Sequence, residues 1–293
     1  MNDYVVTCCS TIDMNLDFFA KRDIPFIPFS FHMDGQEYAD DYGKSISIED
    51  FYKAMENGAM PTTSQITIYE YTSFFEPFLK EGKSVLHLAM SSGISGSCNS
   101  AMQAARDLNE KYEAKVAVVD SLAASSGYGL LVTMAKDNYD KGMSFEENHK
   151  YIEEHKLNVQ HWFFTTDLTT FIRGGRVSKT AGFVGTALHL CPLLHVSYDG
   201  KLIPMEKIRG KKKVIKQIVN KMEELADNGL DYDGYVYISN SACLEDALAV
   251  KEEVLARFPK VKDVEINSIG TVIGSHTGVG TVALFFTGQK RVD

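Results

Sequence analysis

The sequence predicts an α/β protein with two domains, an N-terminal domain on a parallel sheet and a C-terminal domain with a mixed sheet and helices. In the first half, short apolar runs alternate with longer segments of helical period, which is typical of a parallel sheet with crossover helices. In the second half, two strand-like runs flank Asp199-Gly200, which indicates a hairpin. We expect domains over residues 1–158 and 159–293, because 293 residues are enough for two cores.

The first half is expected to begin with a strand at Tyr4–Val6 that ends in Thr7-Cys8-Cys9-Ser10. The extended run Pro25–Phe31 contains two prolines and therefore suits a sheet edge or an irregular segment. Asp34-Gly35 marks a turn. Hydrophobic periodicity predicts strands at about 84–90 and 115–119, and helices at about 47–57, 67–80, 97–112 and from the residues after 121 to 140.

The second half combines helices with strands that need not run parallel. A glycine turn at 173–176 is followed by a predicted helix from about Ser178. The other predicted helices lie at about 145–154, 213–226 and 244–257. Strand-like runs are expected at about 162–165, 193–198, 202–207, 235–239, 264–268 and 281–286.

Composition excludes several classes of function. The net charge of −9 argues against nucleic-acid and anionic-membrane binding, because both need an excess of Lys and Arg. Five cysteines without a CxxC pair indicate free thiols in a reducing compartment, with neither disulfides nor a metal site. No signal peptide and no long apolar run is visible, so we expect a cytoplasmic protein without stable membrane insertion.

Small and hydroxylated residues gather in four segments that we expect to be loops. They are Thr62–Gln65, Ser91–Ser97, Ser121–Gly127 and Gly274–Gly278. Ligands of open α/β sheets bind outside the carboxyl ends of the strands, where several of these loops should lie. Hydroxyls can donate to a buried carboxylate, and the helix expected near Ser97 would add backbone N–H groups. Because helix caps and turns also favour these residues, composition alone predicts only a small anionic or polar ligand.

Three further features have two interpretations each. His276 is either a ligand donor or proton-transfer group, or a turn histidine satisfied by backbone. Arg173 and Arg176 flank two glycines and form either a phosphate or carboxylate site or a structural turn. The basic run at 207–213, which includes Arg209, opposes the dipole of the predicted helix. That run therefore indicates an anion or an acidic partner, or a solvated charged face.

Common catalytic motifs are absent. The sequence lacks a P-loop, a GxGxxG turn, an HExxH helix and a GxSxG nucleophile elbow, and the order Gly93-Ile94-Ser95-Gly96 does not have the elbow spacing. This favours a binding protein without catalytic residues. The alternative is a hydrolase or phosphotransfer enzyme that uses Ser95 and His276.

Together, these segments resemble the DegV family of bacterial fatty-acid-binding proteins. Each matching segment is short, but their order and spacing are specific and extend through most of the chain. The matching segments are Ser10–Asp13, Pro28–Gly35 with Tyr38 and Asp40, Pro61–Gln65, Ser91–Gly96, Asp120-Ser121, Gly174–Ser178, Arg209-Gly210 and Gly274–Gly278. Cys9 stands where the family usually has Asp, and Val279 replaces a common proline.

The resemblance implies one long-chain fatty acid, such as palmitate, held between the two domains, and no other cofactor. It implies that Thr63 and Ser95 hold the carboxylate and that His276 lies near it, and it places Ser64, Ser92 and Gly96 in the same site. The C-terminal domain would contribute the pocket for the acyl chain. Burying about 14 methylenes of a C16 chain at about 0.8 kcal/mol each is worth on the order of 11 kcal/mol before entropic costs.

Better-studied relatives present the fatty acid to a separate ATP-dependent kinase, which makes an acyl phosphate. The resemblance therefore implies a fatty acid kinase as partner. Arg173, Arg176 and Arg209 are then expected to meet the kinase or the phosphate.

Overall fold

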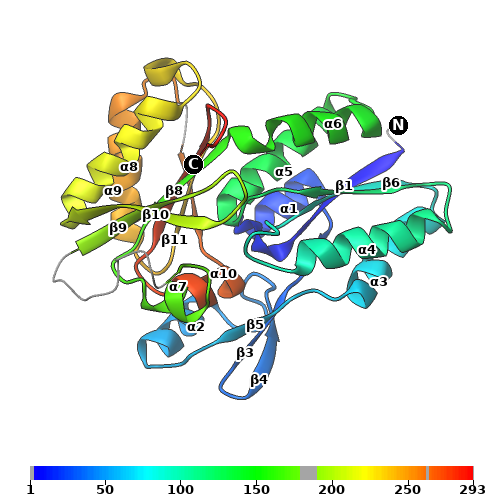
Figure 1. Cartoon of the computed structure of the whole chain (residues 1–293), viewed down its shortest axis with the longest axis horizontal. Coiled ribbons are helices and arrows are strands. Elements are labelled where there is room, and N and C mark those ends of the chain that lie inside the picture. Colours follow the sequence, from blue (N-terminus) through cyan, green and yellow to red (C-terminus); the bar gives the residue numbers. More distant parts are fainter. Residues whose placement is uncertain (1–2, 179–189, 262–263, 293) are drawn as a thin grey trace.

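The computed structural model describes residues 3–178, 190–261 and 264–292, and within them the strands form three sheets (Figure 1). The first sheet has the order β2-β1-β6-β7 and is parallel throughout. Its strands are β1 (Tyr4–Cys9), β2 (Phe26–Ile27), β6 (Ser84–Ala89) and β7 (Val116–Asp120). This confirms the predicted parallel sheet, and β2 lies at its edge as the two prolines indicated.

Two pairs of helices cover the parallel sheet, and in Figure 1 they lie on opposite sides of its strands. One pair, α3 (Ile68–Lys80) and α4 (Ser97–Asn109), packs against β6 and β7. The other pair, α5 (Ser125–Asp140) and α6 (Phe145–His155), packs against β1, β6 and β7. Because both faces are covered, the strands are almost wholly apolar rather than alternating.

A small antiparallel sheet of order β4-β3-β5 holds one of the hydroxyl segments. Its strands are β3 (Ser30–Met33), β4 (Gln36–Ala39) and β5 (Thr62–Ser64). The predicted turn joins β3 to β4, and both Asp34 and Gly35 have positive φ, as a two-residue hairpin turn requires. The segment expected to be a loop at Thr62–Gln65 is therefore mostly a strand. Helices α1 (Leu16–Arg22), which the sequence pattern did not predict, and α2 (Ile48–Glu56) complete this half.

The second large sheet has the order β10-β9-β8-β13-β11-β12 and is mixed, as predicted. All neighbours pair antiparallel except β11 and β12. The strands are β8 (Val159–Phe164), β9 (Leu190–Val196), β10 (Leu202–Arg209), β11 (Val236–Asn240), β12 (Val264–Ser268) and β13 (Val282–Thr287). The hairpin between β9 and β10 turns at Asp199-Gly200, where Gly200 has a φ of 74°.

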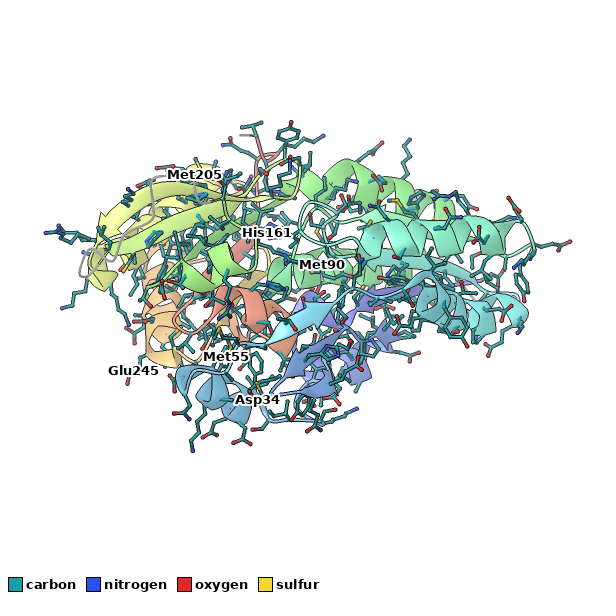
Figure 2. All side chains as sticks on the ribbon, turned by 60° about the horizontal axis from the view of Figure 1, so that its bottom comes forward. Asp34, Met55, Met90, His161, Met205 and Glu245 are labelled. Carbon is teal, nitrogen blue, oxygen red and sulfur yellow. The ribbon has the colours of Figure 1, made fainter. Side chains whose placement is uncertain are left out.

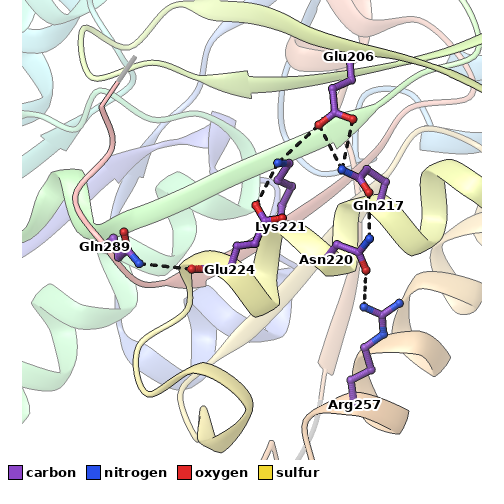
Figure 3. Close-up of polar contacts among 7 residues, drawn as sticks. All are labelled: Glu206, Gln217, Asn220, Lys221, Glu224, Arg257 and Gln289. Carbon is purple, nitrogen blue, oxygen red and sulfur yellow. Dashed lines mark hydrogen bonds and ion pairs between the residues drawn. The ribbon is translucent and has the colours of Figure 1, made fainter.

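Helices α8 (Lys211–Leu225) and α9 (Leu244–Arg257) bury a second hydrophobic core against this sheet. A row of polar contacts links α8 to β10 and α9 (Figure 3). Lys221 lies 3.5 Å from Glu206 of β10, and Arg257 of α9 donates to Asn220. Such partly exposed pairs contribute little stability, so apolar packing holds the helices in place.

Two short helices lie close to the functional site. They are α7 (Thr169–Arg173) and α10 (Thr271–Thr277), which pack against each other. The prediction of a loop at Gly274–Gly278 is wrong, because most of that segment forms the end of α10. Carboxylates from distant segments satisfy the first N–H groups of this helix, which a local pattern cannot reveal. The predicted helix from Ser178 falls on residues 179–189, outside the described residues.

The strands of the parallel sheet precede residue 158 in the sequence, and those of the mixed sheet follow it. The larger of the two buried hydrophobic clusters nevertheless contains residues from both sheets. It contains Val85 and Leu88 of the parallel sheet together with Phe163, Ala283 and Phe285 of the mixed sheet. The two halves therefore share a core at their junction. The division into domains at residue 158 stays a prediction.

Candidate functional site

A cavity of about 360 Å³ lies between the two large sheets. Its volume is in the range of small-molecule sites. Figure 2 shows the labelled cavity residues Met90 and His161 in the middle of the molecule, whereas Met205 lies at the surface. The apolar lining comes from both halves: Phe29, Met90, Ile94, Ala124, Phe163, Phe171, Val196, Leu202, Ile269, Val272, Ile273, Ala283 and Phe285.

Polar side chains gather at one part of this cavity, around a contact between Thr63 and His276. Thr63 lies on β5, where it pairs with Phe31 of β3, and His276 lies in the last turn of α10. The Nε2 atom of His276 is 2.8 Å from Oγ1 of Thr63. The hydrogen bond joins the small sheet of the first half to a helix of the second half.

Electrostatics keeps the His276 imidazole neutral. Burial, reinforced by the positive charges of Arg176 and Arg173, lowers its pKa to about 4. One ring nitrogen therefore carries a proton at pH 7. Nδ1 is buried and has no hydrogen-bond partner among the described residues, and a buried N–H without an acceptor is disfavoured. We therefore assign the proton to Nε2, which then donates to Thr63 Oγ1 and leaves the threonine hydroxyl free to donate into the cavity. Gly174 closes over the other side of the ring, since a Cβ there would lie 2.4 Å from Nδ1.

Ser95 approaches the cavity from the loop that precedes α4. Its Oγ lies 3.2 Å from Oγ of Ser97, which accepts a 3.0 Å hydrogen bond from the backbone N–H of Ile66. This bond ties the Ser95 loop to the chain just after β5, where Thr63 lies. Gly96, the residue before α4, also lines the cavity, and the N–H of Ser97 donates to Ser95 Oγ at 3.2 Å. The N-terminus of a helix favours negative charge nearby.

Arg176 adds a positive charge to this part of the cavity. Its guanidinium donates to the carbonyls of Ile94, at 3.2 Å, and Gly174, at 2.6 Å. Within the described part of the chain no acidic side chain pairs with it, and half-burial lowers its pKa. Hydroxyl donors, a helix N-terminus and an uncompensated guanidinium together suit a carboxylate at the end of an apolar chain.

The structure brings six of the nine predicted site residues to the cavity, namely Thr63, Ser64, Ser95, Gly96, Arg176 and His276. Ser92, Arg173 and Arg209 do not line it, and all three are exposed. Arg173 is still near enough to His276 to lower its pKa. The part that these nine residues play in binding stays a prediction.

Sequence reasoning did not assign five polar residues of the lining to the site, namely Gln65, Ser125, His161, Thr277 and Thr281. Gln65 is exposed, and its amide covers Gly96, where a Cβ would lie 2.1 Å from Oε1. The segment Thr62–Gln65 was a usable signal for Gln65. His161 is buried in β8, its Nδ1 bonds to the carbonyl of Val159, and burial lowers its pKa far below the usual range. Its sequence neighbours carry no signal that it faces a cavity.

The alternative enzyme would pair Ser95 with His276 as its base. An activated serine needs a base within hydrogen-bond reach. Among the described residues, Ser95 Oγ bonds to Ser97 and His276 Nε2 bonds to Thr63, without a hydrogen bond between Ser95 and His276. The described segments also contain no group of three or more His, Cys, Asp or Glu residues placed to hold a metal ion. No helix in these segments has the length and apolar character needed to span a membrane.

The fold and the cavity define a class of protein: two α/β halves that enclose an apolar chamber with hydroxyl, imidazole and guanidinium groups at one part of it. The chain belongs to the DegV family, whose family model, described as uncharacterised proteins, matches residues 5–289. This confirms the resemblance.

Relatives and solved structures cover nearly the whole chain. A DegV domain-containing protein of Clostridium perfringens is 36% identical over 292 residues, which are 99% of each chain. A protein of Thermotoga maritima described as a fatty acid-binding protein is 33% identical over 279 residues, 93% of each chain. A solved structure described as fatty acid binding of a DegV family protein from Thermus thermophilus matches with a TM-score of 0.87 at 28% identity, over 98% of this chain and 100% of the other.

Proposed function

We propose that this protein binds one long-chain fatty acid, with the acyl chain in the apolar cavity and the carboxylate at Thr63 and Ser95. The hydrogen bond between His276 and Thr63 carries this proposal, because it orients a hydroxyl donor toward the cavity beside a second hydroxyl and a guanidinium. The relatives described as fatty acid-binding proteins support the ligand class. Affinity comes mainly from the acyl chain, while the hydroxyls set its direction.

Presentation of the bound carboxylate to a fatty acid kinase is the finer part of the proposal. The exposed Gln65 lies over Gly96, so the carboxylate region is close to the surface. Arg173 and Arg209 are exposed and outside the cavity, which leaves them available to a partner. All five cysteines of the chain are free, which supports a cytoplasmic protein.

Native mass spectrometry of the purified protein tests the ligand. We expect a bound species of fatty-acid mass that organic extraction removes and that added palmitate restores. The double variant Thr63→Ala/Ser95→Ala should retain its fold, measured by circular dichroism, and hold palmitate more weakly than the wild type. An apo mass that does not change with added palmitate or oleate would exclude the proposal.

A kinase assay separates binding from presentation. With a fatty acid kinase and ATP, the wild-type protein should support acyl phosphate formation, and Arg173→Gln/Arg209→Gln should lower that rate while palmitate binding stays unchanged. Equal rates for both proteins would exclude a role for these two arginines.

A further inference from the structure

Two buried carboxylates, Asp13 and Asp40, bind the N-terminus of α10. Asp13 follows the short helix Ser10–Ile12 that comes after β1, and it accepts a 2.9 Å hydrogen bond from the N–H of Gly270. Asp40 follows β4 and accepts from both the N–H and the hydroxyl of Thr271, at 3.2 and 2.7 Å. Two segments of the first half thus satisfy the first donors of a helix in the second half.

Both carboxylates are themselves held in place. The hydroxyl of Ser125 donates to Asp13, and that of Ser10 donates to Asp40, each at 2.6 Å. They close tightly around Gly270, where a Cβ would lie 2.8 Å from Asp13 Oδ1 and 3.2 Å from Asp40 Oδ1. Such close approach leaves α10 little freedom to shift at this end.

Helix α10 has only seven residues, so it has little stability of its own. Its first residues meet the two carboxylates, and its last turn carries His276, which bonds to Thr63. We propose that Asp13 and Asp40 are positioning residues that set the place of His276 through α10. The link to ligand binding rests on the proposed function, whereas the link to His276 does not need a ligand.

The chemistry of the pair predicts which substitutions preserve it. Asp13 and Asp40 are fully buried, and desolvation raises the pKa of both carboxyl groups. Both carboxyl groups act as hydrogen-bond acceptors, and the amide oxygen of an asparagine can accept the same bonds. Asn at position 40 should therefore keep α10 in place, whereas Ala should release it.

Two readouts test the proposal on the full chain: the pKa of His276, followed by NMR in ligand-free protein, and the ratio of affinities for palmitate and hexadecanol. In Asp40→Ala we expect the pKa of His276 to rise from about 4 toward its ordinary value of 6.5. The preference for the acid over the alcohol should fall about tenfold, as expected for one lost hydrogen bond to a charged group. Asp40→Asn should restore both values.

Asp41→Asn is the matched control, because the bonds that Asp41 makes among the described residues stay within its own turn, to Lys44 and Ser45. If Asp40→Ala does not fold, Thr271→Val removes one bond to the same carboxylate and should move both readouts in the same direction. A folded Asp40→Ala or Thr271→Val protein in which the pKa of His276 equals that measured in the wild type would overturn the proposal. Wild-type protein that binds no fatty acid would overturn the proposed function alone.

Discussion

Thr63 of β5 and His276 of α10 are 213 residues apart in the chain, yet their side chains share a 2.8 Å hydrogen bond beside the cavity. Neither residue is distinctive by itself. A threonine in a short edge strand and a histidine between two glycine-flanked residues have many structural explanations. Their contact within one cavity turns two common residues into an oriented donor.

The hydroxyl of Thr63 should contribute to head-group affinity. Thr63→Val keeps the shape of the side chain and removes the donor. We expect palmitate affinity to fall by roughly tenfold to a hundredfold, the range for a hydrogen bond to a charged group, while hexadecanol affinity stays nearly constant. Calorimetry with both ligands measures this. Thr62→Val is the control, because Thr62 is exposed and does not line the cavity. Equal losses in the two variants would contradict the prediction.

Stability should fall as the pH drops below about 6.5. The pKa of His276 is lowered to about 4 and that of buried His87 to about 3, so the unfolded chain binds more protons than the folded chain between these values and 6.5. Stability therefore rises with pH across this window. The raised pKa values of Asp13 and Asp40 act in the opposite direction. Urea unfolding from pH 4 to 7 measures the slope, and His276→Gln should make it shallower. If the free energy of unfolding of His276→Gln changes with pH as steeply as that of the wild type, the predicted contribution of His276 is wrong.

A close backbone contact should make Gly93 sensitive to substitution. A Cβ at Gly93 would lie 2.6 Å from the carbonyl oxygen of Asp199, in the hairpin between β9 and β10. We expect Gly93→Ala to cost about 1–3 kcal/mol, as overpacking does, and to lower the melting temperature. Ser92→Ala, at the exposed neighbouring position, should leave the melting temperature equal to that of the wild type within experimental error. A Gly93→Ala protein as stable as the wild type would contradict the prediction and show that the hairpin between β9 and β10 can move to accept the added methyl group.

The size of the cavity should limit acyl chain length. Ala283 of β13 lines it and is buried, so Ala283→Leu fills part of the space. Each methylene that no longer fits loses about 0.8 kcal/mol, and the preference should shift to shorter chains. Competition among C12 to C18 acids, read by native mass spectrometry, measures the shift. Ala249→Leu, the same change on α9 outside the cavity, should keep the wild-type preference. An unchanged distribution in Ala283→Leu would place the acyl chain elsewhere.

Much of the fold could be predicted because hydrophobic periodicity and turn residues are local signals. The run Ser84–Ala89 and the pair Asp199-Gly200 indicated a parallel strand and a hairpin, and both are present. Helix α10 was missed, since its glycines favour a loop and its first donors are satisfied by Asp13 and Asp40 from the other half.

Some features of the candidate site are also visible in the sequence, whereas others appear only in the tertiary structure. The hydroxyl segments at Thr63 and Ser95 are visible in the sequence because residue type and loop position are local properties. The sequence also determined the family, through the order of its short motifs. Only the tertiary structure decided that Thr63 meets His276, that Arg173 and Arg209 lie outside the cavity, and that His161 lies inside it. These contacts join residues far apart in the chain, and the packing of two sheets around one core brings them together.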